Sequence, residues 1–308
     1  MLKRRVLVTG IVAMALAAAS PAAWCGGAGS STGMGLEFEQ MASARAGGMG
    51  QVVSAMEGDI NLIHYNPAGI ASLSNPELGV AYMLGFGDIQ FLNISCGLPL
   101  GGGIAGVSVS YFNAGSIELT GALIQDQVIN AQTDFIFTGS YAMEMILGMP
   151  LGASIKVLSS SMLQQPAVYA YMFDAGMLYR TPVPGLNAGL ALQNVGSQLV
   201  YYRTAENLPM CVRAGISYNF APLEAVSVTA GFDLKYLVND TTLVSGIGAE
   251  LEYGEVFSAR AGYVIGAAQG LTLGAGFNLN TYIIDYAFEL TPSVSTFGNH
   301  KAALRILL

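Results

Sequence analysis

The sequence predicts an all-β fold, a transmembrane antiparallel up-and-down β-barrel of about 14 strands with an N-terminal plug segment inside the barrel. Charged residues make up 10% of the 308-residue chain and hydrophobic residues 53%, whereas an ordinary soluble domain is about 25% charged. Beyond position 24 no run of about 20 apolar residues could form a membrane helix. Short segments of alternating polarity fill the chain from residue 77 onward, which is typical of strands.

Residues 1–25 are predicted to be a secretory signal peptide. Lys3, Arg4 and Arg5 precede an apolar stretch, and small residues follow at 17–23, as a signal peptidase requires. After cleavage, nine of the 12 basic residues would remain against 20 acidic ones, so nucleic acid is not an expected partner. Export together with a barrel predicts the outer membrane of a diderm bacterium, with outer-membrane lipid as the surroundings.

Residues 26–76 do not alternate and are expected to form the plug. They begin with a Gly/Ser-rich stretch, 26–35, and carry two short motifs rich in glycine and turn-forming residues. These motifs are Arg45-Ala46-Gly47-Gly48-Met49-Gly50 and Tyr65-Asn66-Pro67-Ala68-Gly69. The segment is too short for a domain, and a barrel of 14 strands encloses a lumen wide enough to need filling or to conduct.

Residues 77–308 are predicted to form the transmembrane barrel. Bacterial single-chain barrels have an even number of strands, and about 9–11 residues cross the bilayer when tilted. Because the boundary near residue 280 is weak, 12 strands is the alternative count. The longest connections, 114–132 and 197–208, are candidate extracellular loops. Strands are expected at 77–84, 89–98, 103–113, 133–143, 149–159, 168–180, 186–196, 209–220, 225–238, 242–254, 257–266, 271–280, 281–290 and 300–308.

Alternation also divides each strand into a lipid face and a lumen face. In 226–238, for example, valine, phenylalanine, leucine and tyrosine occupy one face, while Asp233 and Lys235 share the other. A soluble β-sandwich or propeller alternates as well, but it would place charges on its solvent faces. The charged residues expected in the lumen are Lys156, Asp174, Arg213, Asp233, Lys235, Glu250, Glu252, Arg260, Asp285, Glu289, Lys301 and Arg305.

The sequence offers no convincing catalytic, metal or cofactor site. Gly29-Ser30-Ser31-Thr32-Gly33 has nucleophile-elbow spacing without the surrounding strand and helix. The glycine run 101–106 leads into another strand rather than a helix. The two histidines, His64 and His300, are far apart, so no histidine-based metal cluster is expected. The carboxylate pairs Glu250/Glu252 and Asp285/Glu289 are expected to hydrate and stiffen the wall, with acid–base catalysis as the weaker alternative.

The two N-terminal motifs and a series of strand motifs resemble the PorV/PorQ family of outer-membrane proteins, relatives of the FadL-type transporters. The resemblance covers about residues 40–308. It implies a barrel of 14 strands with an N-terminal plug that carries the Asn66-Pro67-Ala68 turn. The strand motifs are Asp174-Ala175-Gly176, LALQNVG at 190–196, Arg213-Ala214-Gly215, Arg260-Ala261-Gly262-Tyr263, Asp285-Tyr286-Ala287-Phe288 and Gly298-Asn299-His300-Lys301.

Two functions follow from the layout and the resemblance. The first is passive transport of a hydrophobic or amphipathic small molecule through the lumen, gated by a shift of the plug around Gly47, Gly48, Met49 and Gly50. The second is a PorV-like role in type IX secretion, in which extracellular loops bind secretion subunits or exported cargo. An enzymatic role, such as that of an outer-membrane lipase, is a distant third.

Overall fold

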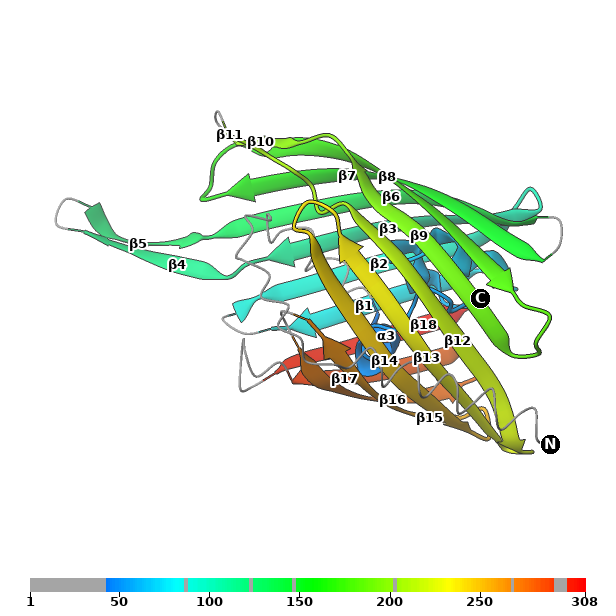
Figure 1. The fold of residues 1–308 in the computed structure, drawn as a ribbon. Coiled ribbons are helices and arrows are strands. Elements are labelled where there is room, and N and C mark those ends of the chain that lie inside the picture. The colour runs from blue at the N-terminus through cyan, green and yellow to red at the C-terminus, as the bar shows by residue number, and fades with distance from the viewer. Residues whose placement is uncertain are drawn as a thin grey trace.

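The computed structural model describes residues 43–85, 88–121, 124–145, 148–201, 204–266, 269–290 and 298–308. The predicted signal peptide, the first part of the predicted plug and the Gly29–Gly33 motif lie outside the described residues. The described chain forms a closed antiparallel β-barrel (Figure 1). The predicted count of 14 strands is confirmed, and the weak boundary near residue 280 is a real turn, with Asn280 at φ 63°.

Consecutive wall strands are neighbours all around the barrel, and β1 pairs with β18 to close it, with Glu77 opposite Leu307 and Leu84 opposite His300. Closure removes sheet edges, so every wall strand is paired on both sides. The wall strands are β1 (Glu77–Leu84), β2 (Gln90–Leu100), β3 (Gly103–Asn113), β6 (Gln132–Met145), β7 (Met149–Met162), β8 (Val168–Arg180), β9 (Leu186–Gly196), β12 (Cys211–Leu223), β13 (Val226–Leu237), β14 (Thr242–Tyr253), β15 (Phe257–Ile265), β16 (Gly270–Leu279), β17 (Tyr282–Leu290) and β18 (Asn299–Leu307).

The two ends of the barrel differ in their connections. At the end that holds the start of β1 and the end of β18, which we call the turn rim, short turns join the strands. At the opposite end, the loop rim, the predicted long connections fold into hairpins that sequence analysis did not foresee. These are β4 (Ser116–Gly121) with β5 (Ile124–Asn130), and β10 (Leu199–Tyr201) with β11 (Thr204–Glu206). The β4–β5 hairpin projects far beyond the wall (Figure 1).

The outer surface of the barrel is apolar along the middle of its strands. Ile155, Val107 and Tyr171 are 64%, 59% and 62% exposed, and their neighbours in sequence turn inward. Large exposed apolar surfaces of this kind mark contact with a partner or with lipid. Because the exposed apolar side chains occupy strand after strand around a closed sheet, the surface fits the hydrocarbon of a bilayer.

Residues 43–76 lie inside the barrel, and we call them the inner segment. They contain a short helix, α3 (Ala44–Gly48), and two 3-10 helices, η1 (Ile60–His64) and η2 (Pro67–Ser72). Ser43, Asp59 and Asn66 cap these helices with side-chain oxygens, as capping residues commonly do. α3 contacts β15–β18, η1 contacts β1 and β2, and η2 contacts β3 and β6–β8, so the segment reaches across the lumen.

The inner segment has an apolar core of its own. Met49, Val52, Ile60, Ile63 and Ile70 are fully buried within one cluster. Among the described residues, no helix combines the length and the apolar composition needed to cross a bilayer.

Candidate functional site

A belt of inward-facing glycines surrounds the inner segment. A Cβ added at Gly152, Gly176, Gly189 or Gly248 would lie well inside 3.0 Å of atoms of residues 49–68, closer than real Cβ atoms come. The wall strands therefore let the inner segment approach backbone to backbone, which side chains would prevent. The belt comprises Gly79, Gly97, Gly106, Gly152, Gly176, Gly189, Gly215, Gly231, Gly246, Gly248, Gly262 and Gly274.

Pairing register brings many of these glycines side by side. Gly152 lies opposite Gly176, and Gly189 lies opposite Gly215. Gly248 lies between Gly231 and Gly262 on its two neighbouring strands. Sequence analysis missed the belt, although glycines at lumen-face positions of successive strands were a signal for it.

The first N-terminal motif packs against the wall, with α3 on β15–β18 and Gly50 on β14 and β15. Gly48 stacks on Gly274, where an added Cβ would lie 3.0 Å from the Gly274 Cα. Thr272 Oγ1 donates to the Gly48 carbonyl at 3.1 Å and accepts from the Gly50 N–H at 2.9 Å. Gly50 has φ +65°, and an added Cβ would lie 2.6 Å from the Ile247 carbonyl. Glycine is therefore required at position 50 both by its backbone angle and by its close contact.

The second motif forms a turn pressed against β7 and β8. Asn66 Oδ1 accepts from the Ala68 N–H at 3.1 Å, and Asn66 Nδ2 donates to the Ser54 carbonyl at 2.7 Å and the Met177 carbonyl at 3.2 Å. Pro67 occupies the first position of η2, where its missing N–H costs nothing. Asn66 thus joins two parts of the inner segment to the wall.

A chain of ion pairs links α3 and η1 through the wall. Arg45 holds Glu250 with two hydrogen bonds, at 3.0 and 2.5 Å. Arg260 bridges Glu250 at 2.5 Å and Asp285 at 2.6 Å. Burial alone would lower the pKa of the Arg45 guanidinium, but the Glu250 carboxylate raises it above its usual value, so Arg45 stays charged.

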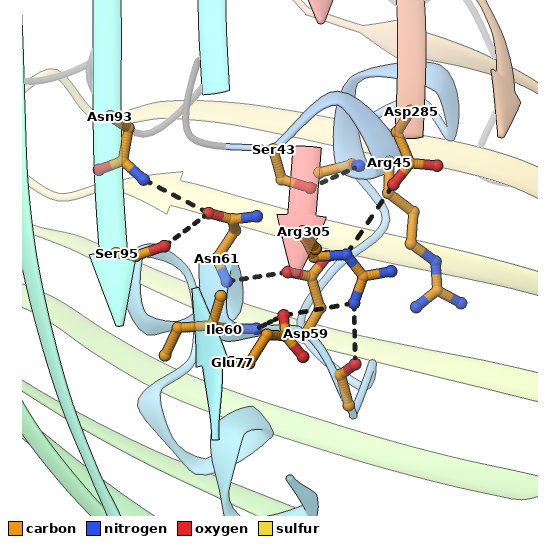
Figure 2. Close-up of polar contacts among 12 residues, drawn as sticks. Ser43, Arg45, Asp59, Ile60, Asn61, Glu77, Asn93, Ser95, Asp285 and Arg305 are labelled. Carbon is orange, nitrogen blue, oxygen red and sulfur yellow. Dashed lines mark hydrogen bonds and ion pairs between the residues drawn. The ribbon is translucent and has the colours of Figure 1, made fainter. Parts of the chain in front are cut away.

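Arg305 completes the chain at the turn rim. It lies between Asp285, Asp59 and Glu77, at 3.9, 3.9 and 3.5 Å (Figure 2). Glu77 also accepts from the Ile60 N–H at 3.1 Å. Figure 2 also shows Asn61 of η1 bonded to the wall. The network therefore holds the inner segment at both α3 and η1.

A second polar cluster holds the middle of the inner segment. Asp233 Oδ2 accepts from the Val53 N–H at 3.0 Å, the Ser54 N–H at 2.9 Å and the Ser54 hydroxyl at 2.6 Å. Arg213 donates to Gln193 at 2.8 Å and lies 5.5 Å from the centre of the Tyr65 ring. On the neighbouring strands, Lys156 and Asp174 form an ion pair at 2.6 Å.

The structure places the charged residues that the sequence assigns to the lumen on the inner side of the wall, all buried except the half-buried Glu252. Glu289 pairs with Lys301 at 2.5 Å. Sequence analysis did not single out Asp59, Glu77, Asn61 or Asn93, because their partners come together only in the closed barrel. In the described part of the chain, no group of His, Cys, Asp or Glu side chains forms a metal site.

The lumen wall becomes apolar near the loop rim. Buried side chains of six neighbouring strands, together with two leucines of the β9–β12 connection, form a cluster that we call the rim cluster. Its buried members are Met83, Phe91, Phe112, Ile136, Leu158, Ala170, Met172, Leu199 and Leu208. The two ends of the lumen therefore differ in chemistry.

At the turn rim the lumen holds a polar cavity of about 330 Å³. Arg45, Arg260 and Arg305 line it together with Glu77 and Glu252. Water can hydrogen-bond to these charged side chains, whereas an apolar molecule would leave them without partners.

The fold and the lumen define a class of protein: a closed membrane β-barrel with an apolar outer face and an N-terminal segment packed inside. Solved structures with this fold include two of the toluene transporter TodX of Pseudomonas putida. One has a TM-score of 0.61 at 12% identity, covering 85% of this chain and 95% of that chain. The other has a TM-score of 0.62 at 11% identity, covering 85% and 96%. A Pseudomonas aeruginosa FadL homologue has a TM-score of 0.51 at 12% identity, covering 86% and 95%.

The comparisons with solved structures show a shared fold. No family model and no curated protein matches the chain. No family match therefore supports the resemblance to the PorV/PorQ family, whereas the barrel fold is shared with these solved structures.

Proposed function

We propose that this protein is a passive outer-membrane channel for hydrophobic small molecules, with the inner segment as its plug. The observation that carries the proposal is the rim cluster. An open porin has a polar, water-filled lumen, but here the loop-rim end of the lumen is lined by apolar side chains of six neighbouring strands. The free energy of an apolar solute falls when it leaves water for such a wall, whereas that of a sugar does not.

The inner segment supports the gating part of the proposal. It crosses the lumen between the apolar loop rim and the polar turn-rim cavity, so a solute that enters at the loop rim meets it. Displacement of the region from Gly47 to Gly50 would separate Gly48 and Gly50 from β14–β16, where both lie directly on the wall backbone. The proposed gate is therefore held by close packing and by the Arg45–Glu250 pair.

The proposal is in line with the solved structures of the same fold, which include a toluene transporter and a FadL homologue. The described carboxylates of the lumen predominantly bind arginine, lysine or backbone N–H groups. This use of the carboxylates favours a structural and gating role over acid–base catalysis.

Uptake into vesicles with a lipopolysaccharide outer leaflet tests the proposal, because that leaflet slows unassisted entry of apolar solutes. The vesicles would contain albumin to trap a fatty acid or cyclodextrin to trap toluene. We expect both tracers to enter faster than into vesicles without protein, and glucose to enter at the same rate in both. Equal rates for all three tracers with and without protein would refute the transport role.

The alternative role, a surface component for secretion, draws on the β4–β5 hairpin, which projects beyond the loop rim (Figure 1). An isolated two-stranded ribbon is marginally stable alone, so a partner would stabilise it. Cross-linking in native outer membranes, compared between the wild type and a variant in which a short turn replaces residues 115–131, tests this role. Identical cross-linked species in both would remove it.

A further inference from the structure

The described parts of the connection between β9 and β12, 197–201 and 204–210, contribute two buried residues to the rim cluster. Leu199, in β10, is 1% exposed, and Leu208, just after β11, is 5% exposed. The other buried members of the cluster belong to wall strands. The two leucines therefore fill space at the loop-rim end of the lumen, in contact with the apolar wall.

We propose that Leu199 and Leu208 occupy the entry site for the apolar solute, and that the segments 199–201 and 204–208 act as a lid that the solute must displace. This inference rests on the proposed transport function and adds its regulation. When the lid is closed, Leu199 and Leu208 cover the rim cluster and exclude water from it. Their side chains are apolar, as the solute is.

A hydrogen-bonded latch holds the lid to the wall. Tyr201 donates its hydroxyl to Ser160 Oγ at 2.6 Å, and Ser160 in turn donates to Asp134. Gln132 Nε2 donates to the other Asp134 oxygen at 2.5 Å. Burial raises the pKa of the Tyr201 phenol to about 12, so the phenol remains a donor at physiological pH.

The base of the lid is anchored separately. Asn239 Nδ2 donates to the Leu208 carbonyl at 2.5 Å, and Asn194 Nδ2 donates to the Pro209 carbonyl at 3.1 Å. Asn194 is itself fixed by Asp174 and Lys156. An anchored base and a side-chain latch further along allow the lid to swing without leaving the barrel.

The space beneath the lid sets the class of solute. An apolar cavity of about 150 Å³ lined by Leu, Ile and Phe stays dry and takes benzene. Two displaced leucine side chains leave a space of that order. The site therefore fits a compact apolar molecule, or the end of an alkyl chain, at one time.

The test uses radiolabelled benzene and the full-length protein in nanodiscs, with empty nanodiscs subtracted. Loss of one net hydrogen bond in Tyr201→Phe should raise the open fraction of the lid up to about tenfold. Apparent benzene affinity should then rise by the same factor, because only the open state binds. Tyr169→Phe is the matched control, since Tyr169 lies on the outer face of β8 at 61% exposure, and it should change nothing.

Hydrogen exchange of the Leu199 and Tyr201 amides gives a second measurement. Benzene should speed exchange in the wild type and leave it unchanged in Leu199→Ala/Leu208→Ala, where benzene occupies the vacated space. Unchanged wild-type exchange at saturating benzene would overturn the lid. If the wild type takes up apolar tracers and Tyr201→Phe takes them up at the same rate, the lid proposal would also be overturned. The transport function would still stand. No uptake by any variant would instead refute the transport function.

Discussion

Replacement of Gly176 by alanine should release the Asn66 turn from the barrel wall. Gly176 faces the lumen on β8, and a Cβ at this position would overlap Asn66 Oδ1, with the Pro67 Cδ 2.9 Å away. The wall strand is paired on both sides, so the turn must move rather than the strand. Asn66 is fully buried, and its movement breaks the bonds that its side chain makes.

The expected cost follows from those bonds. Asn66 makes hydrogen bonds to the Ala68 N–H and to the Ser54 and Met177 carbonyls, each worth about 1 kcal/mol net. Their loss weakens docking of the turn by about 3 kcal/mol, which corresponds to a roughly hundredfold larger open fraction. The barrel itself should remain folded, since no hydrogen bond between wall strands is lost.

Hydrogen exchange measured by mass spectrometry in nanodiscs reports this local opening. Amides at 60–72 should exchange about a hundredfold faster in Gly176→Ala, while strand amides keep the wild-type rate. Gly139→Ala is the control, because no atom lies within 4 Å of a Cβ at that outward-facing position. Exchange of 60–72 within twofold of the wild type would show that close glycine contact does not hold the turn.

Three further predictions concern the gate, the polar cluster and the lipid face. Gly50→Ala should lower the free energy of local opening of residues 44–53 by about 1–3 kcal/mol more than Gly58→Ala does. Both glycines have positive φ, but only Gly50 contacts the wall backbone. Equal rates of amide hydrogen exchange at 44–53 in the two variants would contradict this prediction. Asp233→Asn removes the charge that binds Val53 and Ser54 and should speed exchange of those amides about tenfold, while Asp240→Asn, on a loop, should not. Ile155→Arg, at the middle of β7, should destabilise the barrel in lipid vesicles by about 2–4 kcal/mol, against about 0–1 kcal/mol for Leu223→Arg at the turn rim; equal shifts in urea unfolding would argue against a membrane-facing surface.

The period-two alternation was sufficient to predict the strands, because a sheet with one apolar and one polar face has the same pattern at every crossing. The predicted strand 186–196 coincides with β9, and 103–113 with β3. The hairpins β4–β5 and β10–β11 were missed because they are not part of the closed wall, where one face must be apolar and the other polar.

The site could be predicted only in part. Alternation assigns a residue to a face, but it does not pair Arg45 with Glu250, which lies 205 residues away. The glycine belt depends on register between strands far apart in sequence, as with Gly189 and Gly215. The motif around Asn66 could be recognised in the sequence. Its role in docking the inner segment to the wall could not, because that role depends on the close contacts that Gly152 and Gly176 of the wall make with it.

The most direct test of the account compares uptake with exchange in a single series: wild type, Gly58→Ala, Gly139→Ala, Gly50→Ala and Gly176→Ala. Toluene uptake into lipopolysaccharide-coated vesicles and exchange of the amides at 44–72 would be measured on the same preparations. If the inner segment is the gate, uptake should rise most in Gly50→Ala and Gly176→Ala, whose segment loses its close contact with the wall, and stay at the wild-type rate in Gly139→Ala. Gly58→Ala, which has a strained φ but no close contact at its Cβ, should raise uptake less than Gly50→Ala. The claim that the inner segment is the gate would be contradicted if toluene uptake stayed constant across the series while amide exchange in the inner segment of Gly176→Ala rose about a hundredfold.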